Sequence, residues 1–442
     1  MNVLNFLKKG SLYMKNEEVS LIIDQSLHKI VSNFSNPDAL SEYIAKNSST
    51  TSHLNPTLSD GIPGFLFLFS EFPTYFNDEF IHSYMKKLNN FINNGYITSL
   101  SLWTGLSGVA FSIKLLVKSS NGNYSNFLNS LNNLILDNID SYIIDFRKKL
   151  ERKDITSLDF DSIFGLSGIT RYLLELNEDQ YCQIDDSIKE ILKLLVDLSY
   201  MEINNKPISK ERYNKNATEY LLKKTKHGYL DTGLAHGLCG PLSILSIALE
   251  HGYEVPYQKD AIKYLIASLK KIESFDENKL YNWDGKIERF QKINYRVPAM
   301  YGWCYGLPGI ARSIWIGAKA INSDEYKLYA LSLLKQLTSI SIEKLKINSP
   351  HFCHGYSGVL IIYYLMYLDT KEKDFKNFYT KILHKILEFY EGDNYLSFFN
   401  YDYENNKNLN IGLLEGTSGI ILSLNSVETL SNPQWSKTFL LS

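Results

Sequence analysis

Cysteine is scarce in this chain, and neither sign of charge is in large excess. Four cysteines in 442 residues are too few for a disulfide framework, so a reducing, cytoplasmic compartment is expected. The formal net charge is −2, which gives no electrostatic case for binding nucleic acid. No apolar run approaches the length of a membrane span, and the first residues lack the apolar core of a signal peptide.

Glycine, in contrast, recurs in a fixed pattern. A Gly-x-x-Gly step occurs seven times, at spacings of 44, 60, 72, 69, 49 and 61 residues. The first glycines of the seven steps are Gly61, Gly105, Gly165, Gly237, Gly306, Gly355 and Gly416. A repeat of this length indicates one supersecondary unit that is used again and again.

The segments between the steps have helical patterns of two kinds. A strongly apolar run follows each step, as at 359–366, and an amphipathic stretch such as 259–271 or 374–388 comes later. A helix that is apolar all round is buried, whereas one with a single apolar stripe lies at the surface. The sequence therefore predicts an all-α fold with seven inner and seven outer helices in two concentric rings. A linear solenoid is the competing arrangement, but it would expose a polar face that the inner segments lack.

The residue before each first glycine is polar in six of the seven copies, although each opens an apolar helix. These residues are Asp60, Thr104, Phe164, His236, Tyr305, His354 and Glu415. If all inner helices enter from one end, these side chains gather around one mouth of the ring. Helix N-termini at that mouth favour anions such as thiolates. A purely structural role for the glycines, as sharp entries to crowded helices, remains open.

Two segments interrupt the helical alternation. Residues 200–232 are polar with short extended pieces, and 281–295 are similarly irregular. We expect residues 1–442 to form a single domain that carries these segments as an irregular or β-containing insertion. The basic side chains of the first segment could grip a peptide or simply form a solvated loop.

Two of the seven steps follow strong metal ligands. Cys304 stands in Trp-Cys-Tyr-Gly at 303–306, and Cys353 precedes His354 in Cys-His-Gly at 353–355. Two thiols and an imidazole make a three-ligand zinc site whose fourth position is open, as in catalytic zinc centres. The alternative is that these are two buried thiols and a satisfied core histidine.

Together these motifs resemble the lanthionine synthetase C-like proteins, the stand-alone bacterial lantibiotic cyclases. The resemblance rests on Trp-Cys-Tyr-Gly, Cys-His-Gly, Ala-His-Gly at 235–237 and the seven glycine steps, and covers about Leu58 to the C-terminus. It implies an α/α toroid of fourteen helices with a small β-containing insertion, and one zinc ion per chain. It also implies lanthionine and methyllanthionine formation, in which cysteine thiolates of a precursor peptide add to dehydroalanine or dehydrobutyrine.

The resemblance also assigns roles to individual residues. It makes Cys304, Cys353 and His354 the zinc ligands, His236 the catalytic histidine and Asp161 the acid that works beside it. Asp161 could instead cap the helix near Gly165, because Asp is a favoured N-cap, and His236 could be a capping or core residue.

Aromatic residues line the family's site, at positions that correspond to Trp303 and Tyr305. The family often has an arginine shortly before its Trp-Cys motif, where Met300 stands four residues before Cys304. Arg296 is the nearest candidate for that arginine.

The partners that the resemblance implies are a dehydrated precursor peptide, a separate dehydratase and an ABC-type exporter, gathered at the inner face of the membrane. Two other classes stay open. One is a prenyltransferase-like enzyme that alkylates thiols, although such sites include a carboxylate ligand. The other is a zinc- and thiol-binding protein without activity.

Overall fold

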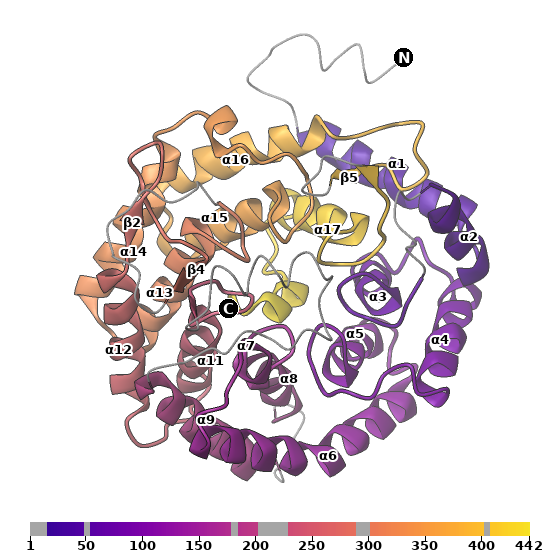
Figure 1. Cartoon of the computed structure of the whole chain (residues 1–442). Coiled ribbons are helices and arrows are strands. Elements are labelled where there is room, and N and C mark those ends of the chain that lie inside the picture. Colours follow the sequence, from indigo (N-terminus) through magenta and orange to yellow (C-terminus); the bar gives the residue numbers. More distant parts are fainter. Residues whose placement is uncertain (1–15, 48–53, 178–183, 202–228, 289–300, 402–406) are drawn as a thin grey trace. The chain divides into compact units, whose positions relative to one another are not determined.

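The fold is mostly helical and groups into two compact units. The computed structural model describes residues 16–47, 54–177, 184–201, 229–288, 301–401 and 407–442. The first unit comprises Met1–Tyr96, Leu115–Asn123 and Ile347–Pro433, and the second comprises Ile97–Lys114, Tyr124–Lys346 and Gln434–Ser442. Figure 1 labels the elements of both units.

The first unit is built from helices of the two ends of the chain. Its helices are α1 (Asn16–Asn33), α2 (Pro37–Asn47), α3 (Ile62–Glu71), α4 (Asp78–Asn93), α15 (Tyr356–Thr370), α16 (Lys373–Leu387) and α17 (Thr417–Glu428). Strands β5 (Asn400–Tyr401) and β6 (Lys407–Asn408) pair antiparallel.

The second unit contains the middle of the chain and its last residues. Its α-helices are α6 (Ser125–Glu151), α7 (Ser157–Phe160), α8 (Leu166–Asn177), α9 (Asp185–Tyr200), α11 (Cys239–Glu250), α12 (Gln258–Lys271), α13 (Leu307–Ala320) and α14 (Asp324–Thr338). Two 3-10 helices are η4 (Ile342–Leu345) and η5 (Gln434–Phe439), and helix α5 (Leu106–Ser119) begins in this unit and ends in the first.

Buried and amphipathic helices alternate as the sequence predicts. Every residue of α15 from Tyr356 to Met366 is buried, so this helix packs on all sides. In α16 the buried residues form one stripe that includes Phe375, Phe378 and Ile382. Within the second unit, α8, α11 and α13 form an inner layer, and α9, α12 and α14 lie outside it (Figure 1). An inner helix begins within each of the seven glycine steps.

The last inner helix obtains its outer partner from the other end of the chain. Helix α17 is followed by η5 instead of an amphipathic helix. Its neighbour in the first unit is α1, and Ser20 of α1 donates a 3.0 Å hydrogen bond to Glu428. The repeat is therefore completed by pairing the first and last helices of this unit.

A side-chain hydrogen bond closes the turn at most of the glycine steps. The third residue of the step donates to the carbonyl seven residues earlier, as Ser107 does to Leu100 and Ser357 to Pro350, both at 2.6 Å. Ser167, Ser418 and Cys239 make the same contact. The incoming loop thus folds back onto the first turn of its own helix. A Cβ on Gly309, the last residue of its step, would lie 2.1 Å from the Trp303 carbonyl oxygen, so this approach requires glycine.

Short strands border the two segments that interrupt the helical pattern. Strand β1 (Tyr229–Asp231) pairs antiparallel with β4 (Lys286–Glu288), and β2 (Ser274–Phe275) pairs with β3 (Tyr281–Asn282). Residues 202–228 and 289–300 lie outside the described residues. The insertion at 200–232, its counterpart at 281–295 and the single-domain organisation therefore stay predictions. In the described part of the chain, no helix combines the length and apolarity needed to span a membrane.

A buried charge cluster fixes the C-terminal segment onto the second unit. Glu175 accepts hydrogen bonds from Arg171 of the same helix at 2.8 Å and from Lys437 of η5 at 2.9 Å. Lys114 lies 3.9 Å away. Burial alone would raise the pKa of Glu175, but the charges of Arg171, Lys437 and Lys114 hold this pKa at about 2. The carboxylate is therefore ionised near neutral pH.

Replacing Glu175 with Gln is expected to destabilise the fold strongly. Arg171 is fully buried, and the substitution leaves its charge without a counter-ion, which costs about 3–5 kcal/mol. The midpoint of urea unfolding measures this loss. Because the pKa of Glu175 is lowered in the folded state, its contribution is full above an unfolded-state pKa of about 4.5 and disappears as the pH falls towards about 2. The difference between wild type and variant should shrink over that window.

Glu190 provides the matched control, because it pairs with Arg147 at the surface, where the two side chains are 34% and 45% exposed. Glu190→Gln should cost less than about 1 kcal/mol. If Glu175→Gln and Glu190→Gln unfold at the same urea concentration, the buried cluster contributes no more to stability than a surface ion pair does.

Candidate functional site

Main-chain hydrogen bonds join the three loops of the second unit that carry site residues. Ser162 donates its N–H to the Ala235 carbonyl at 3.1 Å, and Leu234 donates to the Cys304 carbonyl at 2.9 Å. The loops that precede α8, α11 and α13 therefore lie side by side. Their positions depend on the backbone, so the side chains they present are held at fixed separations.

Cys304 stands at the tip of a tight turn. Tyr301 and Gly306 form an antiparallel bridge at its base, and Gly302 donates its N–H to the Tyr305 carbonyl at 3.1 Å. The Cys304 residue is 4% exposed. Behind it, the indole of fully buried Trp303 donates to the Phe439 carbonyl at 3.0 Å. Trp303 thus supports the loop from the C-terminal segment, and its predicted role in lining the site is not visible in these contacts.

Cys353 and His354 belong to a corresponding loop of the first unit. Phe352 and Cys353 both donate their N–H groups to the Leu414 carbonyl, at 3.1 and 3.0 Å. The ring of buried His351 meets the His354 ring edge to face, with 4.2 Å between centroids. Burial, and then the charge of His354, lowers the pKa of His351, which keeps this ring neutral. His351 therefore supports the orientation of His354 without adding charge.

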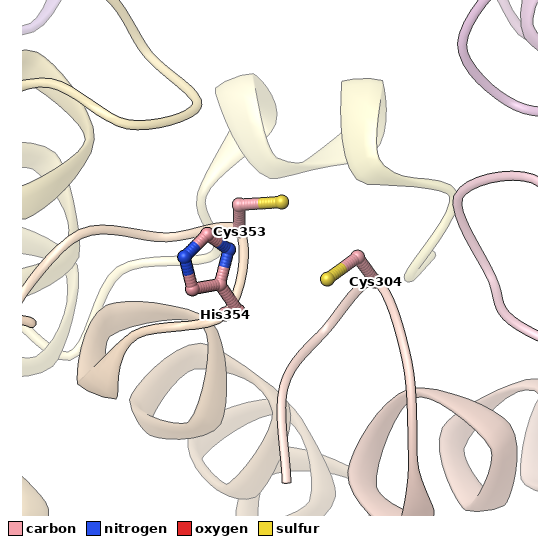
Figure 2. Close-up of side chains that lie close together, drawn as sticks. All are labelled: Cys304, Cys353 and His354. Carbon is pink, nitrogen blue, oxygen red and sulfur yellow. The ribbon is translucent and has the colours of Figure 1, made fainter. Parts of the chain in front are cut away.

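The three predicted metal ligands come together. One ligand atom from each of Cys304, Cys353 and His354 can be chosen so that all lie within 4.8 Å of one another. Figure 2 shows the two sulfurs and the imidazole pointing towards one another. Thiolates and imidazole suit zinc in tetrahedral geometry. The donor set and its spacing therefore fit a zinc ion held by three protein ligands.

Asp161 and His236 form a hydrogen-bonded pair next to Cys304. The His236 Nδ1–H donates to Asp161 Oδ2 at 2.7 Å, and Asp161 is fully buried whereas His236 is 33% exposed. The other oxygen, Oδ1, accepts N–H groups of Ile163, Phe164 and Gly165 at 3.0, 2.6 and 2.9 Å. One oxygen of Asp161 thus holds the loop before α8, although it bonds no N–H group within that helix, and the other oxygen orients the imidazole. The catalytic role of Asp161 stays a prediction.

The pKa of His236 is raised. Burial lowers it, but the hydrogen bond and charge of Asp161, followed by the charges of Asp231 and Cys304, outweigh burial. Phe164 stacks on the ring at 6.1 Å and covers part of it. These charges therefore favour the imidazolium form more than in an isolated histidine, and the His236 side chain remains 33% exposed.

Asp231 is a site residue that sequence reasoning missed. This buried carboxylate accepts the Tyr305 hydroxyl at 2.8 Å on Oδ2 and the Gly233 N–H at 3.0 Å on Oδ1. Burial raises the pKa of Asp231, and the charges of His236 and Lys286 and the two hydrogen bonds oppose that shift. The sequence did contain one indication of this residue, because Asp231 is an acidic residue only five positions before His236. The predicted arginine, Arg296, lies outside the described residues.

Comparisons with known proteins identify the family of this chain. A family model described as lanthionine synthetase C-like protein matches residues 52–440. Nisin biosynthesis protein NisC of Lactococcus lactis subsp. lactis is 31% identical over 426 residues, which cover 90% of this chain and 92% of that protein. A solved structure of nisin cyclase is similar with a TM-score of 0.70 and 29% identity, over 96% of this chain and 97% of the other. This similarity confirms the predicted fold class, an all-α α/α toroid. The chain belongs to the lanthionine synthetase C-like family.

Proposed function

We propose that the protein is a zinc-dependent peptide cyclase that forms lanthionine and methyllanthionine rings. The observation that carries this proposal is the convergence of Cys304, Cys353 and His354 within 4.8 Å, in a chain of this family. The relatives named nisin biosynthesis protein NisC and nisin cyclase support the same class of reaction. The substrate would be a precursor peptide that contains cysteine together with dehydroalanine or dehydrobutyrine.

Cys304, Cys353 and His354 would hold the zinc ion. When bound, zinc would lower the pKa of a coordinated thiol, so that a substrate cysteine ionises at neutral pH. A prenyltransferase-like enzyme would include a carboxylate among its ligands, which the present donor group does not contain. The presence of an acid–base pair beside Cys304 supports catalysis over simple binding of thiols.

His236 moves the proton in this reaction. Its imidazole takes the proton of the substrate thiol, and the sulfur then forms a bond to the β-carbon of the dehydro residue. The electron pair of the carbon–carbon double bond shifts onto the adjacent carbonyl to give an enolate. His236 returns the proton to the α-carbon, so the addition needs no other reactant. Histidine is suited to both steps because its imidazole can both accept and donate a proton.

Asp161 keeps His236 in the form that this sequence requires. Because Asp161 accepts the proton on Nδ1, Nε2 is the nitrogen that exchanges a proton with the substrate. The carboxylate also stabilises the imidazolium that stands between the two steps. Tyr305 or Arg296 would hydrogen-bond the enolate oxygen as further catalytic residues, Arg296 on the basis of its resemblance to the family's arginine.

The partners follow from the same resemblance. A separate dehydratase must produce the dehydro residues before cyclisation, and an ABC-type exporter would remove the modified peptide. We propose that the protein works in the cytoplasm, in a complex with these two proteins at the inner face of the membrane.

Elemental analysis of the purified protein tests the metal site. We expect about one zinc ion per chain in the wild type and a large loss in Cys304→Ala, because two protein ligands hold zinc far less firmly than three. Cys239→Ala is the matched control. Cys239 is also buried, but its thiol donates to the Thr232 carbonyl at 3.2 Å and does not belong to the donor group. A wild-type protein that is free of zinc after purification without chelator would contradict the proposal.

Cyclisation of a purified dehydrated peptide tests the role of His236. His236→Asn should slow ring closure by about 10²–10⁴-fold, the usual contribution of a general acid–base group. The rate is measured as the loss of free peptide thiols with time. Remaining thiols are alkylated and counted by mass spectrometry. His251→Asn, at the opposite end of α11 from His236, should leave the rate unchanged. Wild-type speed in His236→Asn with a normal zinc content would exclude His236 from proton transfer.

The pH dependence of Asp161→Asn tests the hydrogen-bonded pair. Asn keeps an acceptor for the three loop N–H groups but removes the negative charge, so the pKa of His236 should fall. In the proposed sequence the neutral imidazole first takes the thiol proton, so the acid limb of the rate should move to lower pH with the pKa of His236. An NMR titration of labelled histidine measures the same shift directly. Asp159→Asn is the control and should leave the pKa of His236 unchanged, since Asp159 accepts hydrogen bonds from Thr156 and Lys149 instead. An unmoved His236 titration in Asp161→Asn would refute the pairing.

A further inference from the structure

Asp276 is a buried carboxylate whose two oxygens serve different parts of the second unit. It lies between strands β2 and β3 and is only 3% exposed. Its Oδ1 accepts the N–H groups of Asn278 and Leu280 at 2.7 and 3.1 Å. Its Oδ2 accepts the hydroxyl of Tyr301, which is 25 positions further along the chain. One side chain therefore closes the turn of the β2–β3 hairpin and binds a residue outside it.

The hydroxyl of Tyr301 is bonded to the hairpin twice. It donates to Asp276 and accepts from the side-chain amide of Asn278 at 3.2 Å. Tyr301 is 3% exposed, and a hydroxyl buried to this extent is costly without hydrogen-bond partners. Because the hairpin supplies both an acceptor and a donor, it holds the side chain of Tyr301 in one place.

The hairpin is itself attached to two helices of the second unit. Tyr281 of β3 donates its N–H to the Gln336 side chain of α14 at 2.9 Å. Directly after β3, the indole of fully buried Trp283 donates to the Leu269 carbonyl of α12 at 2.9 Å. The hairpin is therefore a fixed support for Tyr301.

Tyr301 forms the base of the turn that carries Cys304. Its main chain bridges to Gly306, so these two residues close the turn and leave Cys304 at its tip. Leu234 holds the tip through the Cys304 carbonyl, whereas the hairpin holds the base through the Tyr301 side chain. Two separate points of attachment fix the orientation of a turn. The direction of the Cys304 side chain therefore depends on the bond between Tyr301 and Asp276.

We propose that Tyr301 and Asp276 are positioning residues that fix the direction of the Cys304 sulfur towards the metal. This inference rests on the proposed function, because it concerns the same zinc ion. Neither residue belongs to the donor group of Cys304, Cys353 and His354. A ligand that is already held in its binding orientation loses less conformational freedom when the metal binds, so the affinity for the metal is higher.

The zinc affinity of the purified full-length protein tests the proposal. The zinc-free protein is titrated with zinc in competition with a chromophoric chelator of known affinity. Tyr301→Phe keeps the ring but removes the bond to Asp276. It should weaken zinc binding by about 10-fold, the lower end of the loss that follows when groups orienting a metal ligand are removed. The absorption bands of the cobalt(II)-loaded variant should also shift, because they depend on the coordination geometry of the metal.

Two further variants keep the test decisive. Asp276→Asn retains an oxygen for the hairpin N–H groups but offers Tyr301 an amide donor in place of the acceptor, so it should also weaken zinc binding. In the double variant with Tyr301→Phe the factors should not multiply, because both changes remove the same bond. Asn278→Ala removes only the partly exposed donor to Tyr301. It should weaken binding by about 2- to 5-fold even if the other variants fail to fold.

Tyr329→Phe is the matched control. Tyr329 of α14 donates its hydroxyl to Glu273, the residue directly before β2. This variant therefore removes a bond between a tyrosine and a carboxylate at the same hairpin, but neither residue belongs to the turn of Cys304. Its zinc affinity and cobalt spectrum should match those of the wild type.

The outcomes separate this inference from the proposed function. A wild type that binds zinc but closes no rings refutes the proposed reaction and leaves the inference about Cys304 intact, whereas a wild type that binds no zinc refutes both. Zinc binding with unchanged affinity and cobalt spectrum in Tyr301→Phe and Asp276→Asn refutes the positioning role alone. Equal losses in Tyr301→Phe and Tyr329→Phe would mean that zinc binding depends on the general stability of the hairpin, which also overturns the inference.

Discussion

Main-chain hydrogen bonds between successive loops hold the candidate site in register. In the second unit, Trp103 donates to Ile163, Ser162 to Ala235 and Leu234 to Cys304. In the first unit, Cys353 donates to Leu414, and Leu414 donates to Ser59. Each loop can fold back closely onto the start of its own helix because a Cβ on glycines such as Gly105, Gly165 and Gly355 would collide with backbone atoms of the same loop. The chemistry of the site can therefore vary through side chains while its spacing is set by backbone.

Asp161 shows how one carboxylate joins this scaffold to the proposed chemistry. Three N–H groups of the loop before α8 converge on Oδ1, which fixes the carboxyl plane and leaves Oδ2 directed at His236. Structural and catalytic roles are usually weighed as alternatives for such a residue. Here the cap supplies the rigidity that a proton-transfer pair needs, because a freely rotating carboxylate would not select one imidazole tautomer.

The positions where inner helices begin, and the candidate site residues beside them, could be predicted from the sequence, since each motif lies within four to eight consecutive residues. The alternation of helix types follows from periodicity in the same way, and Cys304, Cys353 and His354 stand next to the steps. Asp231 could not be found by these means, because its partner Tyr305 is 74 positions away and the contact depends on the pairing of β1 with β4. The replacement of a seventh amphipathic helix after α17 by α1 was equally invisible, because it joins opposite ends of the chain.

The charges around His236 also bear on why the proposed reaction would need a metal ion. Asp161, Asp231 and Cys304 all favour the imidazolium form of His236, which suits a residue that donates a proton to carbon. The same two carboxylates oppose the ionisation of any thiol placed near Cys304, because like charges repel more strongly where water is excluded. A site built only from these residues would thus have a good acid and a poor nucleophile. A divalent cation held by Cys304, Cys353 and His354 would resolve this conflict, since it would favour thiolates locally while the carboxylates continue to favour a protonated His236.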